Sequence, residues 1–221
     1  MVELKPFTLI CGHYGCGKTN LSLNLAVDLA KSGKQVSLVD LDIVNPYFRS
    51  SDFRAVAEEA GVRVIAPGYA GSTLDSPALP AEIFSVFEST GWVIFDVGGD
   101  DVGATALGRF APKIAQKDYD LLYVVNKYRP ITAEAAGAEE LLREIEAASR
   151  LRATGVVNNS HLMQLTEPET IRAGVPYAQQ TARELGLPLR FTTAPEAVAA
   201  SLGDVENLYP VKIYVKTPWM E

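Results

Sequence analysis

Eight consecutive residues near the N-terminus combine three glycines with a lysine and a threonine. They read Gly-His-Tyr-Gly-Cys-Gly-Lys-Thr and match the pattern G-x-x-x-x-G-K-T. In that pattern the glycines let backbone N–H groups converge on phosphate oxygens, the lysine meets the β- and γ-phosphates, and the threonine hydroxyl binds Mg²⁺. We therefore expect a nucleoside triphosphate with Mg²⁺ here, contacted by Gly12, His13, Tyr14, Gly15, Cys16, Gly17, Lys18, Thr19 and Asn20.

The surroundings of this loop distinguish a functional motif from a chance match in a glycine-rich turn. An apolar run over residues 7–11 is typical of a buried strand and comes directly before the loop. Leu21, Leu25 and Leu29 recur every four residues directly after it, as they do on one face of a helix. The helix matters for the chemistry, because its N-terminus adds a positive dipole end beside the phosphates.

Aspartates end two later apolar runs. Asp40 and Asp42 close the run that starts at Val36, and Asp96 closes the run that starts at Trp92. Carboxylates in such places hold Mg²⁺ or orient a water for attack on the γ-phosphate. We expect Asp96 near the metal, and we expect Asp40 and Asp42 to divide the metal and the water between them. The alternative is ordinary turn chemistry, in which aspartates are common.

Two glycines follow Asp96 in a D-x-x-G pattern. In nucleotide switches the backbone N–H of such a glycine touches the γ-phosphate and reports its loss. Gly98 or Gly99 is therefore expected to contact the nucleotide. Asp100 and Asp101 beyond them fit a solvated turn equally well.

The residues that would select the base are less distinctive. A GTP-binding protein normally carries N-K-x-D after a late strand, and residues 126–129 begin this pattern but end in Arg129. An arginine has no acceptor for the N–H groups of guanine, so the sequence disfavours GTP. Asn158 and Asn159 follow another apolar run and offer both a donor and an acceptor to adenine, although an ordinary asparagine turn is the alternative. Residues 192–195 are expected on the other side of the base.

Strand and helix patterns alternate along the chain, and they must position these residues. The alternation predicts one α/β domain over residues 1–221, a doubly wound, mostly parallel sheet with helices on both faces. Ligands of such sheets bind at the carboxyl ends of the strands, where the motif residues lie. The expected strands are 7–11, 36–41, 62–66, 92–97, 121–125, 153–157 and 189–192, with a short edge strand in the tail 211–216. The expected helices are 17–32, 52–60, 79–90, 104–116, 133–148, 168–185 and 195–202, with Thr132 as an N-cap and Gly33, Gly61, Gly91 and Gly186 in left-handed C-caps.

Composition narrows the class of protein further. A net charge of −7 and a pI of about 5.0 argue against a general nucleic-acid binder. No apolar run reaches the roughly 20 residues of a membrane span, and the N-terminus lacks the apolar segment of a signal peptide. Two cysteines give no disulfide framework, and two histidines, His13 and His161, do not make a zinc site. We expect a cytoplasmic protein.

The chain resembles the MinD/ParA/nitrogenase-iron-protein group of P-loop ATPases, the SIMIBI or deviant Walker A class. The resemblance covers roughly residues 7–200 and is carried by the loop 12–19, the segments 21–26 and 39–42, Phe95 with Asp96, and residues 155–160. It implies a parallel sheet of about seven or eight strands. It also implies slow, switch-like ATP hydrolysis and a cycle between a monomer and an ATP-bound dimer. Through the resemblance, Lys18 contacts phosphate, Thr19 binds Mg²⁺, Asp42 orients the water with Asp40 and Asp96 at the metal, and Asn159 contacts adenine.

One departure from this family concerns its signature lysine, which reaches the partner's nucleotide across the dimer. His13 occupies that position here, and Tyr14 follows where the family has glycine. An imidazole is a poor substitute for a permanent cation. Arg49, after the D-x-D, is a hypothetical replacement, in cis or in trans, and a solvated loop residue is the alternative.

We therefore interpret the chain as an ATP-binding protein and slow Mg²⁺-dependent ATPase that signals its nucleotide state to a protein partner. Residues 43–54 and 98–110 are the expected partner surface, and a nucleotide-dependent homodimer is compatible with the resemblance. The alternative is an ATP-dependent small-molecule ligase or kinase, similar to dethiobiotin synthetases, with an acceptor pocket near Tyr47, Tyr69 and residues 68–77. A scaffold that binds ATP without hydrolysing it is the third interpretation, and Lys18, Thr19 and the three aspartates disfavour it.

Overall fold

A computed structural model of the chain describes residues 2–42, 53–66, 81–99, 101–132 and 134–215. Its centre is one eight-stranded sheet with the order β3-β2-β4-β1-β5-β6-β7-β8, and every neighbouring pair is parallel. This confirms the predicted fold class. The strands are β1 (Phe7–Gly12), β2 (Val36–Asp40), β3 (Val62–Ile65), β4 (Trp92–Asp96), β5 (Tyr119–Val125), β6 (Gly155–Asn158), β7 (Leu189–Pro195) and β8 (Leu208–Val211).

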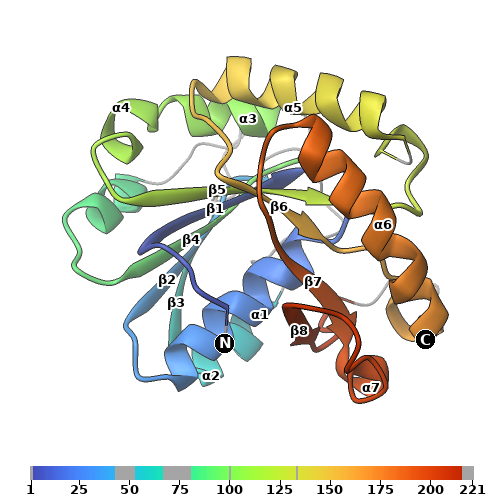
Figure 1. Cartoon of the computed structure of the whole chain (residues 1–221). Coiled ribbons are helices and arrows are strands. Elements are labelled where there is room, and N and C mark those ends of the chain that lie inside the picture. Colours follow the sequence, from blue (N-terminus) through green and yellow to red (C-terminus); the bar gives the residue numbers. More distant parts are fainter. Residues whose placement is uncertain (1, 43–52, 67–80, 100, 133, 216–221) are drawn as a thin grey trace, which may run out of the picture.

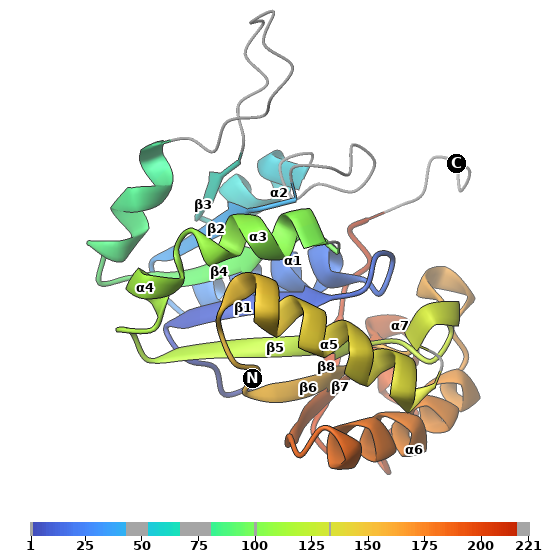
Figure 2. The same ribbon diagram turned by 90° about the horizontal axis from the view of Figure 1, so that it is seen from above.

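Helices cover both faces of the sheet, as the two views show (Figures 1 and 2). Helices α3, α4, α5 and α6 pack on one face, and α1 and α2 pack on the other. The helices are α1 (Lys18–Lys31), α2 (Arg54–Glu59), α3 (Asp101–Gly108), α4 (Ala111–Ile114), α5 (Ala135–Ser149), α6 (Pro168–Glu184) and α7 (Glu196–Ala199), with 3₁₀ turns η2 (Ala81–Phe87), η3 (Pro130–Thr132) and η4 (Met163–Leu165).

The two-sided burial explains why the strands are apolar without alternation. Along β1, Leu9 joins the core under α3, α4, α5 and α6, and the next residue, Ile10, joins the core under α1 and α2. Neither side chain has any exposed surface. Successive strand residues point to opposite faces, so a sheet covered on both sides needs an apolar residue at every position.

Several local predictions were wrong. The helix expected over residues 104–116 is two helices, because Pro112 stands in the first turn of α4 and begins a new helix. Within the helix predicted over residues 79–90, the described residues Ala81–Phe87 form the 3₁₀ turn η2 in place of an α-helix. Thr132 is not an N-cap: its hydroxyl donates to the carbonyl of Asn126 at 3.2 Å, and Glu134 precedes α5.

The predicted left-handed glycines are confirmed at Gly33, Gly61 and Gly186, which all have positive φ, and the prediction is wrong at Gly91. A Cβ on Gly91 would lie 2.9 Å from the carbonyl oxygen of Gln35, so this glycine permits a close backbone approach. The predicted tail strand is also misplaced. The strand is β8, and residues 212–215 run on past it as a strap across the N-terminal turns of α1.

Candidate functional site

The phosphate-binding motif forms a tight turn between β1 and α1. Gly15 and Gly17 have φ of 75° and 92°, a region that residues with a side chain rarely adopt, so both positions require glycine. Gly17 is the N-cap of α1, no side chain caps this end, and the first turn holds no acidic residue. The helix thus begins without a capping side chain, and its positive dipole end favours an anion at this turn, as the motif predicts.

Lys18 is held over this turn. It is 7% exposed, and its Nζ donates to the carbonyl of His13 at 3.1 Å. A Cβ on Gly99 would lie 2.6 Å from the backbone nitrogen of Tyr14 and 2.9 Å from the Lys18 ammonium. Gly99, which follows β4 in the chain, therefore packs directly on the phosphate turn and beside the Lys18 ammonium.

The three predicted aspartates gather at the carboxyl edge of the sheet. β2 and β4 are neighbours with Asp40 beside Asp96, and β4 also pairs with β1. The backbone N–H of Asp42 donates to Oδ1 of Asp40 at 2.9 Å, and Ser22 donates to Oδ1 of Asp96 at 3.2 Å. Burial, and next the charge of Asp40, raise the pKa of Asp96 to about 7, while Lys18 and a hydrogen bond from Thr19 act in the opposite direction.

These residues fit a hard divalent cation. Asp40 and Asp96 are buried, and Oδ2 of Asp96 has no hydrogen-bond partner among the described residues. A nearby cation would satisfy that oxygen and offset the repulsion between the carboxylates. No group of three or more His, Cys, Asp or Glu residues with metal-site geometry occurs among the described residues. Mg²⁺ does not need one, because it keeps several waters and takes further ligands from substrate phosphates.

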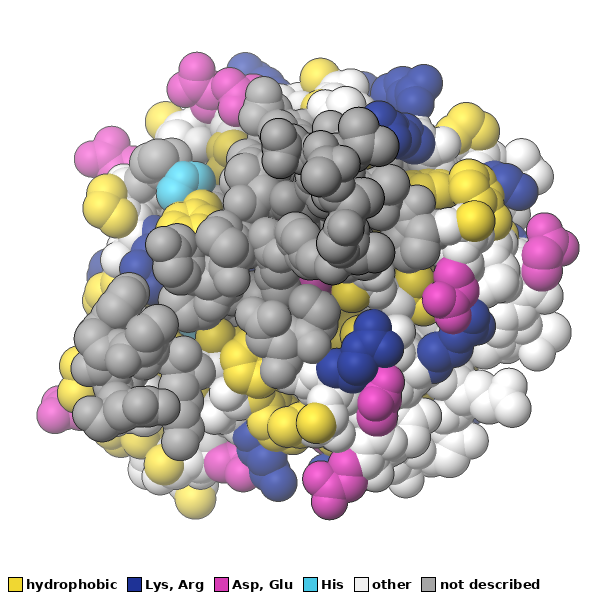
Figure 3. Space-filling model, turned by 180° about the vertical axis from the view of Figure 1, so that it is seen from behind, with side chains coloured by type: hydrophobic (Ala, Val, Ile, Leu, Met, Phe, Trp, Pro, Cys, Tyr) yellow, Lys and Arg dark blue, Asp and Glu magenta, His cyan; other side chains and the backbone are white. Residues whose placement is uncertain are grey.

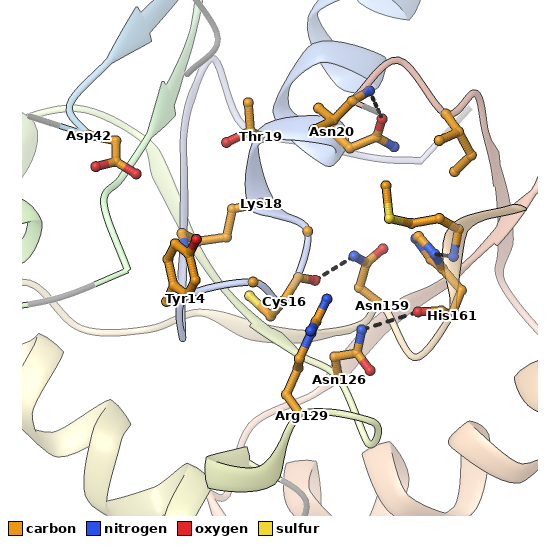
Figure 4. Close-up of a pocket in the computed structure, with 15 residues that line it drawn as sticks. Tyr14, Cys16, Lys18, Thr19, Asn20, Asp42, Asn126, Arg129, Asn159 and His161 are labelled. Carbon is orange, nitrogen blue, oxygen red and sulfur yellow. Dashed lines mark hydrogen bonds between the residues drawn. The ribbon is translucent and has the colours of Figure 1, made fainter. Parts of the chain in front are cut away.

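A cavity opens from the phosphate turn toward the loop after β6 (Figure 4). Lys18, Tyr14 and Asp42 lie on one side of this view, and Asn159 and His161 lie on the other, with Arg129 between the turn and Asn126. The lining residues are Tyr14, Gly15, Cys16, Gly17, Lys18, Thr19, Asn20, Asp42, Asn126, Arg129, Asn159, His161, Met163, Ile213 and Val215. One cavity is thus lined by four segments: the phosphate turn, the loop after β5, the loop after β6 and the C-terminal strap.

The two predicted asparagines after β6 have different surroundings. Asn159 lines the cavity, donates to the carbonyl of Cys16 at 2.6 Å and accepts a hydrogen bond from the hydroxyl of Thr193. Asn158 does not line it: its amide donates to Thr192 at 3.3 Å and accepts from the N–H of Ser160. Residues 192–195 are also absent from the lining, and the hydroxyls of Thr192 and Thr193 pair with these two asparagines.

Asn20 lines the cavity, and its side chain also holds the C-terminal strap. Its amide donates to the carbonyl of Lys212 at 2.9 Å and accepts from the N–H of Tyr214 at 2.8 Å. Asn24, one turn later in α1, makes two similar bonds to Lys212. These bonds hold the strap and with it Ile213 and Val215, two lining residues that no sequence motif indicated.

His13 stands at the position where the sequence comparison expected a signature lysine. Burial is the main cause that lowers the pKa of His13, and the charges of Lys18 and Arg129 act in the same direction. The guanidinium of Arg129 rests on the phosphate turn, since a Cβ on Gly15 would lie 3.4 Å from its Cζ. Arg129 therefore brings to this turn a permanent cation that His13 does not. Arg49, the predicted substitute, lies outside the described residues.

The sequence of the chain matches one known family over most of this site. A sequence model of the CobQ/CobB/MinD/ParA nucleotide-binding domain matches residues 8–166. The chain belongs to the CobQ/CobB/MinD/ParA nucleotide-binding family. The matched region contains the phosphate turn, the three aspartates and the β6 loop, so the chain is a nucleotide-binding domain and the resemblance found in the sequence is confirmed. No curated protein sequence matches the chain.

Solved structures share the fold of this family member. The signal recognition particle 54 kDa protein from Aeropyrum pernix K1, in complex with GDP, is 20% identical with a TM-score of 0.56, over 85% of this chain and 41% of that protein. The cell division protein FtsY from Thermotoga maritima is 21% identical with a TM-score of 0.57, over 88% of this chain and 64% of that protein. At this identity the likeness concerns the fold, and the present chain spans less than two thirds of either protein.

Positive and negative side chains are mixed on the described surface of one face of the molecule. On the described part of the face shown in Figure 3, Lys and Arg side chains alternate with Asp and Glu and form no continuous basic area. A nucleic-acid backbone is usually bound by a continuous basic surface. No helix among the described residues is long and apolar enough to cross a membrane.

We expect His161 to make stability fall in mild acid. Burial, followed by the charge of Arg129, lowers its pKa to about 4, whereas an unfolded histidine titrates near 6.5. Between these two pH values the unfolded state binds more protons than the folded state. The contribution of neutral His161 to the free energy of unfolding is therefore complete above pH 6.5 and is lost as the pH falls toward 4. The full loss is about 3 kcal/mol at 1.36 kcal/mol per pKa unit. Urea unfolding of wild type and His161→Phe at pH 7, 5.5 and 4.5 measures this loss. If the free energy of unfolding falls equally with pH in both proteins, His161 is not its cause.

Proposed function

We propose that this nucleotide-binding domain is a slow Mg²⁺-dependent ATPase that acts as a switch for a protein partner. The observation that carries the proposal is the meeting of Lys18, Thr19 and the three aspartates at the uncapped N-terminus of α1. Thr19, Asp40 and Asp96 would hold Mg²⁺, which would neutralise charge on the β- and γ-phosphates. Lys18 would stabilise the charge that develops on the γ-phosphate, and Asp42 would orient the attacking water.

The choice of ATP over GTP is supported by the polar groups of the cavity. Among the described lining residues the one carboxylate is Asp42, which lies at the phosphate end near Lys18. The far end offers Asn126, Asn159 and His161. Guanine recognition normally needs a carboxylate that accepts from its N–H groups, whereas asparagines can serve the donor and acceptor of adenine.

The proposed partner surface is only partly described. Of residues 43–54, those from 43 to 52 lie outside the described part of the chain. In the other segment, Gly103 and Gly108 pack closely on Gly98 and on the carbonyl of Ala148, and of the side chains described over 103–110 only Thr105 and Arg109 are exposed. Tyr14, 47% exposed on the phosphate turn, would extend this surface.

Hydrolysis of ATP and GTP by the purified chain with Mg²⁺, together with its mass in each nucleotide state, tests the proposal. Slow turnover selective for ATP, with an ATP-dependent change in mass or in partner binding, is the expected result. Tight ATP binding without turnover at a constant monomer mass would contradict the switch and favour the ligase or kinase alternative. The pocket expected for that alternative, near Tyr47, Tyr69 and residues 68–77, lies outside the described residues.

A further inference from the structure

A buried imidazole faces the end of the cavity that lies across from Lys18 and Asp42 (Figure 4). His161 is 6% exposed and comes three residues after Asn158, at the carboxyl edge of the sheet. Its Nδ1 accepts a hydrogen bond from the backbone N–H of Met163 at 3.2 Å. A neutral imidazole that accepts at Nδ1 carries its proton on Nε2, so Nε2 is a donor.

This donor has no hydrogen-bond partner among the described residues. Leaving a buried N–H unpaired is costly, and native structures pair nearly all such groups. Two hydrogen bonds nevertheless hold this residue: the N–H of Met163 holds the ring at Nδ1, and the amide of Asn126 donates to the backbone carbonyl of His161 at 3.4 Å. Met163, which holds Nδ1, has φ of 55°, a strained backbone for a residue with a side chain. Strain of this kind clusters at ligand sites.

The surroundings of His161 fit a flat heterocycle. Met163 lies beside His161, Ile213 and Val215 give the same cavity further apolar walls, and the amides of Asn126 and Asn159 give it polar groups. A purine base matches this combination of apolar and polar groups, because its two faces are apolar and its edge is polar. The phosphate turn lies at the other end of the same cavity, so a nucleotide bound there would extend its base toward His161.

We propose that His161 determines base specificity by donating a hydrogen bond from Nε2–H to N1 of adenine. The proposal rests on the proposed function and identifies what reads the base at that site. Residues 158–161 have the spacing of N-K-x-D, with His161 where that motif places its aspartate. An aspartate accepts from N1–H of guanine, whereas this imidazole donates, which suits the unprotonated N1 of adenine and opposes the N–H of guanine.

The test is calorimetric binding of ADP, GDP, 1-deaza-ADP and 7-deaza-ADP to the full chain with Mg²⁺. Diphosphates avoid turnover, and the two analogues remove one ring acceptor each. Wild type is expected to bind 1-deaza-ADP about tenfold more weakly than ADP, and 7-deaza-ADP equally well, as the loss of one buried hydrogen bond implies. Equal binding of ADP and 1-deaza-ADP, or a loss confined to 7-deaza-ADP, would overturn the proposal.

Variants add a second readout. In His161→Phe the difference between ADP and 1-deaza-ADP is expected to vanish, and in His161→Asp the ratio of GDP to ADP affinity is expected to rise at least tenfold. Leu165→Ala, at a residue 71% exposed in the same loop, is the control and should bind as wild type does. The comparison of analogues on wild type stays decisive if a variant does not fold.

The outcomes separate this proposal from the one on which it rests. A wild type that binds no purine nucleotide, or prefers GDP, would refute the proposed ATP site. A wild type that prefers ADP but does not distinguish 1-deaza-ADP would refute the role of His161 alone.

Discussion

Lys18→Ala is expected to lower the rate of ATP hydrolysis by about a thousandfold and to weaken nucleotide binding by about tenfold or more. The ammonium is buried, lies on the phosphate turn through the carbonyl of His13, and is in close reach of Gly99. In such a water-poor site one fixed charge is worth far more than in solvent. The effect should be larger on the rate than on binding, because negative charge on the transferred group is redistributed as the bond breaks.

Single-turnover hydrolysis measures the rate, and calorimetry with ADP measures the affinity. Lys31→Ala is the matched control, since this lysine is exposed at the other end of the same helix. A melting curve in the absence of nucleotide is needed as well, to show that the variant is folded. The positive charge of Lys18 stabilises the buried carboxylate of Asp96, and its removal is expected to lower the stability of the protein. A folded Lys18→Ala protein that hydrolyses ATP within threefold of wild type would refute the assignment.

The strands and the phosphate turn were predictable because their signals are local. A buried parallel strand must be apolar along its length, and the turn needs glycines at fixed places, so residues 7–19 indicate both. The sequence also predicted that Asp40 and Asp96 lie at the same edge of the sheet, since the carboxyl ends of parallel strands meet there, whereas the pairing of β2 with β4 was not predicted.

The far end of the cavity was not predictable, because it depends on contacts between distant segments. Asn20 holds the strap through bonds to residues more than 190 positions away, and no pattern in either segment records them. The alternation of residues 211–216 indicated a strand instead. His161 was missed for another reason: its importance is an unpaired N–H, which appears only when the partners of every buried atom are known.

The same limit applies to Thr132 and Asn158. Each has a residue type that is common at caps and turns, so the sequence offered Thr132 as a cap and Asn158 as a base contact. In the folded chain the hydroxyl of Thr132 donates to the carbonyl of Asn126, the residue after β5, and the amide of Asn158 pairs with Thr192 and Ser160. Local propensity identifies groups that need a partner, and the packing of the sheet decides which partner they receive.

Asp42→Asn is expected to lower kcat for ATP hydrolysis by about a hundredfold to a thousandfold while leaving the affinity for ADP within threefold of wild type. The substitution keeps the size of the side chain and the backbone N–H that donates to Asp40. It removes the charge that would orient or accept a proton from the attacking water. A residue that acts only in the transition state lowers kcat without changing ground-state binding.

Dependence on Mg²⁺ distinguishes this role from metal binding, which the sequence left open between Asp40 and Asp42. In Asp42→Asn the low rate should persist at saturating Mg²⁺, whereas Asp40→Asn should shift the Mg²⁺ concentration needed for half-maximal rate. Asp118→Asn, at a side chain 67% exposed in a surface ion pair with Lys5, is the control for removal of one charge. If excess Mg²⁺ restores Asp42→Asn, then Asp42 holds the metal, and the water must be oriented by Asp40 or by the backbone around Gly99.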